Sequence, residues 1–244
     1  MNEPLLETRG LTRIFGGLVA VRDVDMQIRE GEIFGLIGPN GAGKTTLFNM
    51  VSGVLKPTSG RVIFAGQDYT GMPAHLVCRQ GIVHTHQVVK PFRDMTVYDN
   101  VRVGLQFGGR EHARPGSVHE QVMAILDYVG LAGRAQELAR SLPIGYLKRL
   151  EIGRALATRP RLLLLDEVMG GLGPAEIATT MRLIQDIRDS GITVFMIEHH
   201  MKAVMGISDR VMVLHHGETI ALGTPQEVSH DPVVIDAYLG EAAV

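Results

Sequence analysis

The stretch from Gly38 to Thr46 constrains the fold of this chain more than any other part of its sequence. It reads Gly-Pro-Asn-Gly-Ala-Gly-Lys-Thr-Thr and fits the pattern G-x-x-x-x-G-K-[ST] of a phosphate-binding loop. The apolar run 33–38 predicts a strand before the loop, and a helix is predicted to open near Thr45, as the pattern requires. Glycines permit positive φ, so that successive backbone amides can point at one anion, and a helix N-terminus adds a positive dipole end. The stretch therefore predicts a site for a nucleoside triphosphate at a strand-to-helix turn.

The side chains of the loop predict how the triphosphate would be held. Lys44 offers a point charge to the β- and γ-phosphates, and the Thr45 hydroxyl is a hard oxygen ligand for Mg²⁺. The alternative, a glycine-rich turn with an incidental lysine, is disfavoured because four fixed identities occur in the right context. No Asn-Lys-x-Asp tetrapeptide occurs in the sequence, which counts against a GTPase. The nucleotide-binding residues predicted in the loop are Gly38, Pro39, Asn40, Gly41, Ala42, Gly43, Lys44, Thr45 and Thr46.

Two adjacent carboxylates end a second apolar run, 161–167, and predict the other half of a catalytic site. Asp166 is placed to hold Mg²⁺ directly or through water. Glu167 is placed to orient and deprotonate the water that attacks the γ-phosphate. The alternative, an acidic strand end without a role, is disfavoured by the phosphate-binding loop upstream. The sequence thus predicts Lys44 and Glu167 as catalytic residues for hydrolysis of the nucleotide.

The order of the apolar runs predicts an α/β fold. Short runs rich in β-branched residues alternate with helical periods, which indicates layers of helices and strands. The runs 162–165 and 192–197 do not alternate with polar residues, so they are predicted to be central strands buried on both faces. The segment Arg22–Ile28 does alternate, as a half-exposed antiparallel strand would. Further strands are predicted at 61–64 and 81–83.

The middle of the chain is predicted to be mostly helical. Thr96 and Ser117 each open a capping-box pattern ahead of an apolar period, so a helix should start after each. The polar Gly/Pro stretch 108–116 between them is typical of a loop. Residues 88–158 therefore form a helical insertion in this prediction. Beyond it, Pro174 at a first helical position and Gly191 at the end frame another amphipathic helix.

Composition excludes several classes of protein. The 244 residues carry 24 Lys+Arg against 26 Asp+Glu, so the net charge of −2 offers no electrostatic footprint for wrapping nucleic acid. The single cysteine, Cys78, excludes an intramolecular disulfide and a cysteine-cluster metal site. The sequence from Met1 is not typical of a secretory signal, and no window approaches the roughly 18 to 20 apolar residues of a spanning helix. A role at a membrane would therefore require other subunits to span it.

In their order along the chain, the motifs resemble those of the nucleotide-binding subunit of an ATP-binding cassette (ABC) transporter. Such subunits present an aromatic residue, a phosphate loop, a glutamine, a signature, an acidic pair and a histidine, and candidates occur here in that order. The resemblance covers essentially the whole length and implies a RecA-like P-loop α/β core with an antiparallel β-subdomain and an inserted helical subdomain. Residues 1–244 would form one ABC ATPase domain. Approximately 1–87 and 159–244 would form the core and β-subdomain, and approximately 88–158 the helical subdomain.

The resemblance adds three residues to the predicted site. Phe15 matches the aromatic residue that stacks on adenine, a contact that needs only a flat π face. Gln87 matches the glutamine that touches Mg²⁺ and the attacking water, and the segment 88–92 after it is where the family receives the coupling helix of its membrane partner. His199 matches the switch histidine that hydrogen-bonds the γ-phosphate. His84 and His86 next to Gln87 suggest a metal site but lack a clear third ligand.

The signature departs from the family pattern Leu-Ser-Gly-Gly-Gln. The corresponding run is Leu142-Pro143-Ile144-Gly145-Tyr146, in which only Leu142 and Gly145 agree. Pro143 lacks both the N–H and the hydroxyl of the usual serine. The resemblance implies that Leu142, Ile144 and Gly145 contact the nucleotide of a partner subunit, because the signature acts in trans. Gly173 stands where the family has Asp, or Asn in its branched-chain amino-acid importers, and the resemblance therefore casts doubt on symmetric hydrolysis.

The C-terminal segments resemble the ATPases of branched-chain amino-acid importers most closely; these are 197–210, 223–225 and 236–241. The resemblance implies an ATP-hydrolysing subunit that works with ATP and Mg²⁺ at the cytoplasmic face of the inner (plasma) membrane, as a peripheral protein. Its partners would be integral-membrane permease subunits, a second ABC ATPase in a hetero- or homodimer and, indirectly, a periplasmic solute-binding protein, with no nucleic acid. Three alternatives stay open: an ABC ATPase for another cargo such as urea, aromatic acids or lipid, a soluble non-transport ABC ATPase, and a regulatory subunit that barely hydrolyses ATP.

Overall fold

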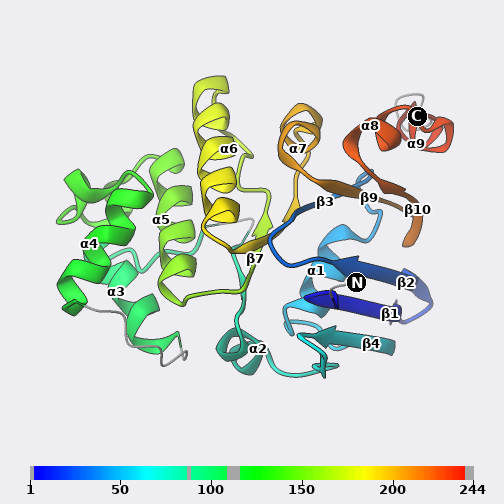
Figure 1. Cartoon of the computed structure of the whole chain (residues 1–244), viewed down its shortest axis with the longest axis horizontal. Coiled ribbons are helices and arrows are strands. Elements are labelled where there is room, and N and C mark those ends of the chain that lie inside the picture. The colour runs from blue at the N-terminus through cyan, green and yellow to red at the C-terminus, as the bar shows by residue number, and fades with distance from the viewer. Residues whose placement is uncertain (1–2, 87–88, 109–115, 240–244) are drawn as a thin grey trace.

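A six-stranded sheet forms the centre of the molecule, which is described from a computed structural model (Figure 1). The structure describes residues 3–86, 89–108 and 116–239. Neighbouring strands of the central sheet are parallel, except that the edge strand β10 runs antiparallel to β9. In spatial order the strands are β10 (Glu218–Gly223), β9 (Arg210–His215), β3 (Ile33–Ile37), β8 (Thr193–Ile197), β7 (Leu162–Asp166) and β6 (Ile82–His84).

The three central strands are buried along their whole length. Every residue of β3, β7 and β8 is buried, which confirms the prediction for the runs 162–165 and 192–197. Alternate residues of these strands enter two separate hydrophobic clusters, with Leu163 and Leu165 on one face and Leu162 and Leu164 on the other. The sheet therefore carries a core on each side, as expected for parallel strands covered on both faces.

A second, antiparallel sheet covers one of these faces together with α1. Its strands, in spatial order, are β2 (Leu18–Ile28), β1 (Leu6–Phe15), β4 (Ser59–Phe64) and β5 (Gln67–Asp68). Buried and exposed residues alternate along β2 from Val24 to Ile28, which confirms the predicted half-exposed strand. Helix α1 (Lys44–Val51) contributes Phe48, whose ring lies 4.5 Å from the ring of Phe195 in β8, measured between centroids. This contact ties the helix after the phosphate loop to the central sheet.

The other face of the central sheet is covered by helices. They are α6 (Pro174–Asp189), α7 (Met201–Ile207), α8 (Pro225–Ser229) and α9 (Pro232–Leu239). Leu183, Ile184 and Ile187 of α6 lie in the same hydrophobic cluster as Leu163 and Leu165 of β7. Pro174 is the first residue of α6, as predicted, and Gly191 follows the helix with φ +94°, a value that favours glycine.

Three longer helices lie together at one end of the molecule (Figure 1). They are α3 (Val97–Phe107), α4 (Val118–Tyr128) and α5 (Ile144–Ala157). Two short 3₁₀ helices, η1 (Ala132–Arg134) and η2 (Ala139–Ser141), lie between α4 and α5 in the chain. Another helix, α2 (Ala74–Gln80), precedes β6. The capping box at Ser117 is present: Ser117 N donates to Glu120 Oε2 at 2.6 Å and Glu120 N to Ser117 Oγ at 3.2 Å. At Thr96 the hydroxyl accepts from Asp99 N as predicted. The Asp99 carboxylate, however, accepts from that same hydroxyl and not from the backbone amide of Thr96, so the capping box is incomplete. Most of the predicted loop 108–116 lies outside the described residues.

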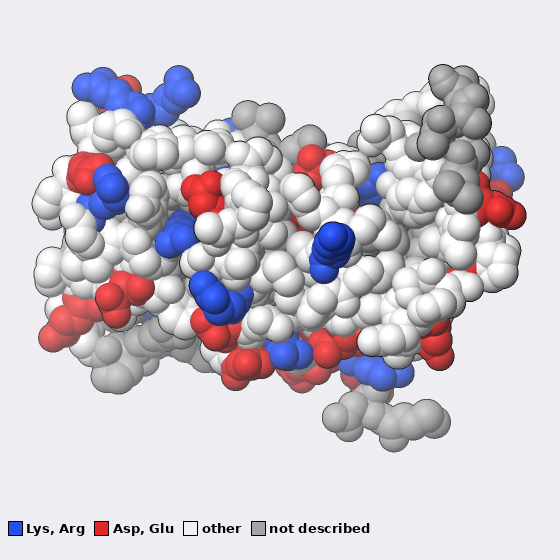
Figure 2. Space-filling view, turned by 90° about the horizontal axis from the view of Figure 1, so that it is seen from above, with Lys and Arg blue, Asp and Glu red and all other residues white. Residues whose placement is uncertain are grey.

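The surface carries charges of both signs. On the face drawn in Figure 2, Lys and Arg side chains lie among Asp and Glu side chains, and uncharged residues cover most of the area. Among the helices of the described ranges, none combines the length and the apolar character needed to cross a bilayer.

Candidate nucleotide site

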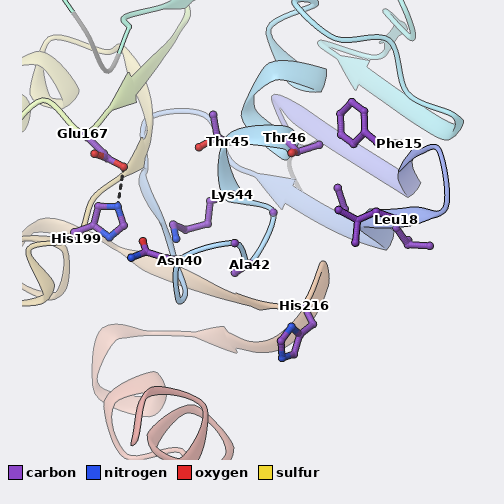
Figure 3. A pocket seen from close by; sticks show the side chains of 14 residues that line it. Phe15, Leu18, Asn40, Ala42, Lys44, Thr45, Thr46, Glu167, His199 and His216 are labelled. Atoms are coloured by element: carbon purple, nitrogen blue, oxygen red, sulfur yellow. Dashed lines mark hydrogen bonds and ion pairs between the residues drawn. The ribbon is translucent and has the colours of Figure 1, made fainter. Parts of the chain in front are cut away.

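A cleft of about 620 Å³ lies beside the phosphate loop (Figure 3). Figure 3 shows the loop between two groups of side chains, with Glu167 and His199 on one side and Phe15 and Leu18 on the other. The cleft is lined by Phe15, Leu18, Val19, Ala20, Asn40, Gly41, Ala42, Gly43, Lys44, Thr45, Thr46, Glu167, His199 and His216. Most of the predicted loop residues thus face one cavity together with two residues from distant strand ends.

Glycines give the phosphate loop its shape. Gly38, Gly41 and Gly43 have φ values of +148°, +77° and +99°, which side-chain-bearing residues rarely adopt. A Cβ atom at Gly38 would collide with the carbonyl of Leu214, and one at Gly43 with the carbonyl of Ala20. Helix α1 begins directly after Gly43, at Lys44, close to the predicted start at Thr45. The loop therefore opens onto a helix N-terminus, where unpaired backbone amides favour an anion.

The Lys44 side chain folds back along its own loop. Its Nζ donates hydrogen bonds to the carbonyl oxygens of Gly38 at 2.6 Å and Pro39 at 2.7 Å. Lys44 is buried at 6% exposure, yet it lines the cleft, so its charge lies next to the cavity. Thr45 and Thr46 follow on the first turn of α1 and also line the cleft.

The two adjacent carboxylates occupy different positions. Asp166, the last residue of β7, is buried at 4% exposure and lies behind the cleft rather than on its wall. Its Oδ2 is 3.7 Å from His84 Nε2, whereas its buried Oδ1 has no hydrogen-bond partner among the described residues. Glu167 follows with a left-handed backbone, φ +49°, and its Oε1 lies 2.7 Å from His199 Nε2 on the cleft wall. The change of backbone direction after β7 thus separates the two acids.

A buried charge cluster lies behind Glu167. Lys148 of α5, at 7% exposure, donates from Nζ to the carbonyl oxygen of Glu167 at 2.7 Å. Glu198, at 2% exposure, accepts from Met169 N at 2.7 Å, and burial raises the pKa of Glu198 to about 7. Burial lowers the pKa of Lys148 and raises the pKa of Glu151, which accepts from His86 N at 3.1 Å. Lys148 and Glu198 could not be predicted from the sequence, because no local pattern links them to Glu167.

The remaining predicted residues divide into three groups. Phe15 is 43% exposed on the cleft wall, and the Arg13 guanidinium lies 4.5 Å from its ring centroid. Gln87 lies outside the described residues. Leu142, Ile144 and Gly145, at the start of α5, do not line this cleft. Gly145 instead packs so closely against α6 that a Cβ atom there would collide with the Glu176 carboxylate. The rings of His84 and His86 are tilted by 51° with centroids 5.3 Å apart, and the described ranges contain no group of three or more His, Cys, Asp or Glu side chains that could hold a metal ion.

Four cleft residues were missed by the sequence analysis. Leu18, Val19 and Ala20 follow the Gly16-Gly17 turn, and Leu18 pairs with Phe15 across the β1–β2 hairpin. The two-glycine turn was a usable signal, since it predicts a tight hairpin that brings Leu18 opposite Phe15, with Val19 and Ala20 next along the strand. His216 lies in the β9–β10 turn with φ +47°, and the next residue, Gly217, donates from N to Ala42 O at 3.0 Å. This long-range contact has no counterpart in the local sequence.

Comparison with known families accounts for this arrangement. The family described as "ABC transporter" matches residues 21–170, which include the phosphate loop and the acidic pair. The chain belongs to the ABC transporter family. A second family description, "Branched-chain amino acid ATP-binding cassette transporter", matches residues 218–244. These matches confirm the family resemblance that the order of the motifs predicted.

Several ABC proteins resemble the chain over its full length. It is 42% identical to the high-affinity branched-chain amino acid transport ATP-binding protein LivG of Salmonella typhimurium, with 99% of this chain and 100% of the relative covered. It is 40% identical to the corresponding protein BraF of Pseudomonas aeruginosa, with the same coverage. The lipopolysaccharide export system ATP-binding protein LptB of Escherichia coli is 34% identical, with 97% of each chain covered.

Solved ABC cassettes share the fold. An ATP-binding cassette of an ABC transporter in its ADP conformation superposes with a TM-score of 0.88 at 30% identity, covering 98% of this chain and 100% of that one. A nucleotide-free cassette gives a TM-score of 0.87 at 31% identity, covering 96% and 98%. The predicted fold class is thereby confirmed. As a member of the ABC family, the chain is an ATP-binding and ATP-hydrolysing cassette.

Proposed function

We propose that the chain is the ATPase subunit of an ABC importer for branched-chain amino acids. The observation that carries this proposal is the identity of 40 to 42% to LivG and BraF over 99% of the chain. The match of residues 218–244 to the branched-chain amino acid cassette family supports it independently, because that segment lies outside the nucleotide site. Lipid export is less well supported, since LptB is 34% identical over 236 residues.

ATP binding is assigned to the wall of the cleft. The backbone amides at the start of α1 and the ammonium of Lys44 would hold the phosphates, which suits a loop whose glycines leave the amides accessible. Phe15 would stack on adenine from the tip of the β1–β2 hairpin, where its ring is 43% exposed. In this pose Leu18 and Val19, which line the same wall, would contact the base or ribose.

The residues present fit Mg²⁺. The buried Asp166 Oδ1 has no hydrogen-bond partner among the described residues, so a cation would satisfy an otherwise costly orphan oxygen. The Thr45 hydroxyl on the cleft wall is a second hard oxygen donor, and such donors suit Mg²⁺. We assign Thr45 and Asp166, with Gln87, as the residues that would hold the ion. When bound, Mg²⁺ would neutralise charge on the phosphates.

Hydrolysis is assigned to Glu167 and His199. Glu167 would accept the proton of the attacking water, and a positioned base of this kind contributes about 10²- to 10⁴-fold in rate. His199 would donate a hydrogen bond to the γ-phosphate and hold the Glu167 carboxylate in place, which its 2.7 Å contact supports. Both side chains would reach the terminal phosphate from the ends of adjacent strands, β7 and β8.

The start of α5 is assigned to a partner subunit. Leu142, Ile144 and Gly145 lie away from the cleft of their own chain, and Ile144 is 48% exposed, which suits a contact with the nucleotide of a second ABC ATPase. We further propose that the chain is a peripheral protein at the cytoplasmic face of the inner membrane. It would bind integral-membrane permease subunits, and a periplasmic solute-binding protein would deliver the solute to those subunits. The grouping of α3 to α5 at one end supports a helical subdomain of about residues 88–158 beside a core and β-subdomain of 1–87 and 159–244.

Uptake by the assembled transporter tests this proposal. Cells expressing the chain with its neighbouring transport genes should accumulate labelled leucine, and E167Q should abolish accumulation while the complex still assembles in membranes. K202M, which alters an exposed lysine just after His199, serves as the control and should leave uptake unchanged. Accumulation of another solute but not leucine would contradict the cargo. Unchanged uptake with E167Q would contradict the role of Glu167.

A further inference from the structure

The Lys148 ammonium reaches the backbone of Glu167 from a different part of the fold. Lys148 lies early in α5, one of the three helices grouped at one end of the molecule (Figure 1), whereas Glu167 follows β7 of the central sheet. The Nζ-to-carbonyl distance of 2.7 Å is that of a strong hydrogen bond from a charged donor. Lys148 itself does not line the cleft, so any effect on ATP would pass through Glu167.

The backbone of Glu167 needs support of this kind. Its φ of +49° is left-handed, a conformation that is unfavourable for a residue with a side chain. Such a conformation persists only where its surroundings fix it. Glu167 N donates to Ile197 O at 2.9 Å, while its carbonyl accepts from Lys148 Nζ and, at 3.2 Å, from Gly170 N. The residue is thus held on the amide side by β8 and on the carbonyl side largely by Lys148.

The burial of the Lys148 ammonium costs free energy. Burying an ammonium is unfavourable unless nearby acids and hydrogen bonds compensate it. The acids facing it are Glu151 on its own helix, Glu167 and Glu198, and they oppose the effect of burial on its pKa. Two roles fit these surroundings: the lysine neutralises the buried acids, or it holds the carbonyl of Glu167.

We propose that Lys148 is a positioning residue for ATP hydrolysis, because its bond to the Glu167 carbonyl maintains the left-handed backbone that directs the Glu167 carboxylate to His199 and the cleft. This inference rests on the proposed role of Glu167 as the base. Loss of the ammonium lets the peptide after Glu167 turn, and a misplacement near 1 Å costs a reaction about 10²-fold. Binding of ATP, which depends on the phosphate loop, is unaffected.

The test is steady-state ATP hydrolysis by the full chain, purified with the subunits that accompany it. K148M should lower kcat by about 10- to 100-fold and leave KM for ATP within about two-fold. K148R keeps a charged donor and should restore most of kcat. K202M, the same change at an exposed lysine, should match wild type. Thermal unfolding of each variant separates loss of activity from loss of fold.

A double variant distinguishes the two roles. In K148M/E198Q the most deeply buried of the three acids facing Lys148 also loses its charge, so a lysine that only neutralises charge is needed less and kcat recovers toward that of E198Q. If Lys148 positions Glu167, kcat of the double variant stays as low as that of K148M. Recovery in the double variant, or a K148M kcat equal to wild type, overturns the inference. E167Q is measured alongside: wild-type turnover by E167Q would overturn the role of Glu167 itself, a failure distinct from that of Lys148.

Discussion

His199 Nε2 lies 2.7 Å from Glu167 Oε1, so that side chains from the ends of two adjacent parallel strands meet on the wall of the nucleotide cleft. The imidazole and the carboxylate are both partly exposed to the cavity, with His199 at 47% and Glu167 at 18% side-chain exposure. Each can therefore restrain the other while a face of each stays accessible to a bound phosphate and to water.

Substitution of His199 is expected to impair chemistry more than binding. H199A removes both a donor to the γ-phosphate and the restraint on Glu167, and loss of one such donor typically costs about 10²- to 10³-fold in kcat. H199Q keeps an N–H donor and should retain more activity. ATP affinity, measured by calorimetry, should change little in either variant. A kcat for H199A within two-fold of wild type, taken as roughly the scatter of such assays, would contradict this role.

Gly43 is expected to tolerate no side chain. Its φ of +99° and its approach to the carbonyl of Ala20 in β2 mean that G43A must distort the loop or the strand. Strain of this kind costs about 1–3 kcal/mol, and ATP affinity should fall because the amides no longer converge. G17A is the matched control, since a Cβ atom there meets nothing within 4 Å. Urea unfolding and ATP titration of both variants would test this, and equal behaviour would count against it.

Phe15 is expected to contribute to affinity and not to stability. Its ring is 43% exposed, so F15A removes little from the core. Stacking of a base on an aromatic ring is worth about 1–3 kcal/mol by alanine substitution, so ATP should bind F15A roughly 10-fold or more weakly. F15W keeps a flat π face and should bind ATP as wild type does. A melting temperature that falls in F15A without any loss of ATP affinity would indicate a purely structural residue.

The buried carboxyl of Glu198 is expected to make stability depend on pH. Burial raises its pKa from 4.5 to about 7, although the cation of Lys148 and the amides of Met169 and His199 oppose the rise, whereas Glu167 adds to it. Because the folded chain holds this proton more tightly than the unfolded chain, the contribution of Glu198 is fully present below pH 4.5 and is lost as the pH rises through about 7.

E198Q isolates this contribution. Glutamine keeps an oxygen acceptor for Met169 N but does not ionise, so the free energy of unfolding of wild type should fall relative to E198Q as the pH rises from 4.5 to about 7. Denaturant unfolding of the two proteins across this range provides the measurement. If the free energies of unfolding of wild type and E198Q depend on pH in the same way, the pKa of Glu198 is the same in the folded and the unfolded chain, which would contradict this prediction.

Contiguous features of the site could be predicted from the sequence. The loop from Gly38 to Thr46 is recognisable because its glycines, lysine and threonine act through neighbouring backbone positions. The strand ending in Asp166 and Glu167 is recognisable because burial on both faces removes polar residues from the run before the acids. The capping box at Ser117 was likewise readable, since its two partners lie three residues apart.

Contacts between distant segments could not be predicted in the same way. Lys148 and Glu167 meet only because α5 packs against the end of β7, and a lysine four residues into a helix is usually solvent-exposed. His216 reaches the cleft because the β9–β10 turn is bonded to Ala42 of the phosphate loop. Asp166 lies behind the cleft wall because it belongs to the buried strand β7, whereas Glu167 lies on the wall after a left-handed backbone that no pattern of side chains announces.

The two hydrogen bonds from Lys44 to the carbonyls of Gly38 and Pro39 join the end of the phosphate loop to its beginning and so close the loop into a ring. Its curvature is therefore built into the polypeptide and does not have to be induced by the incoming nucleotide. A receptor of fixed shape loses little conformational entropy on binding, so association can proceed at a rate set by diffusion and charge. Any movement that accompanies hydrolysis would then have to come from segments outside this loop.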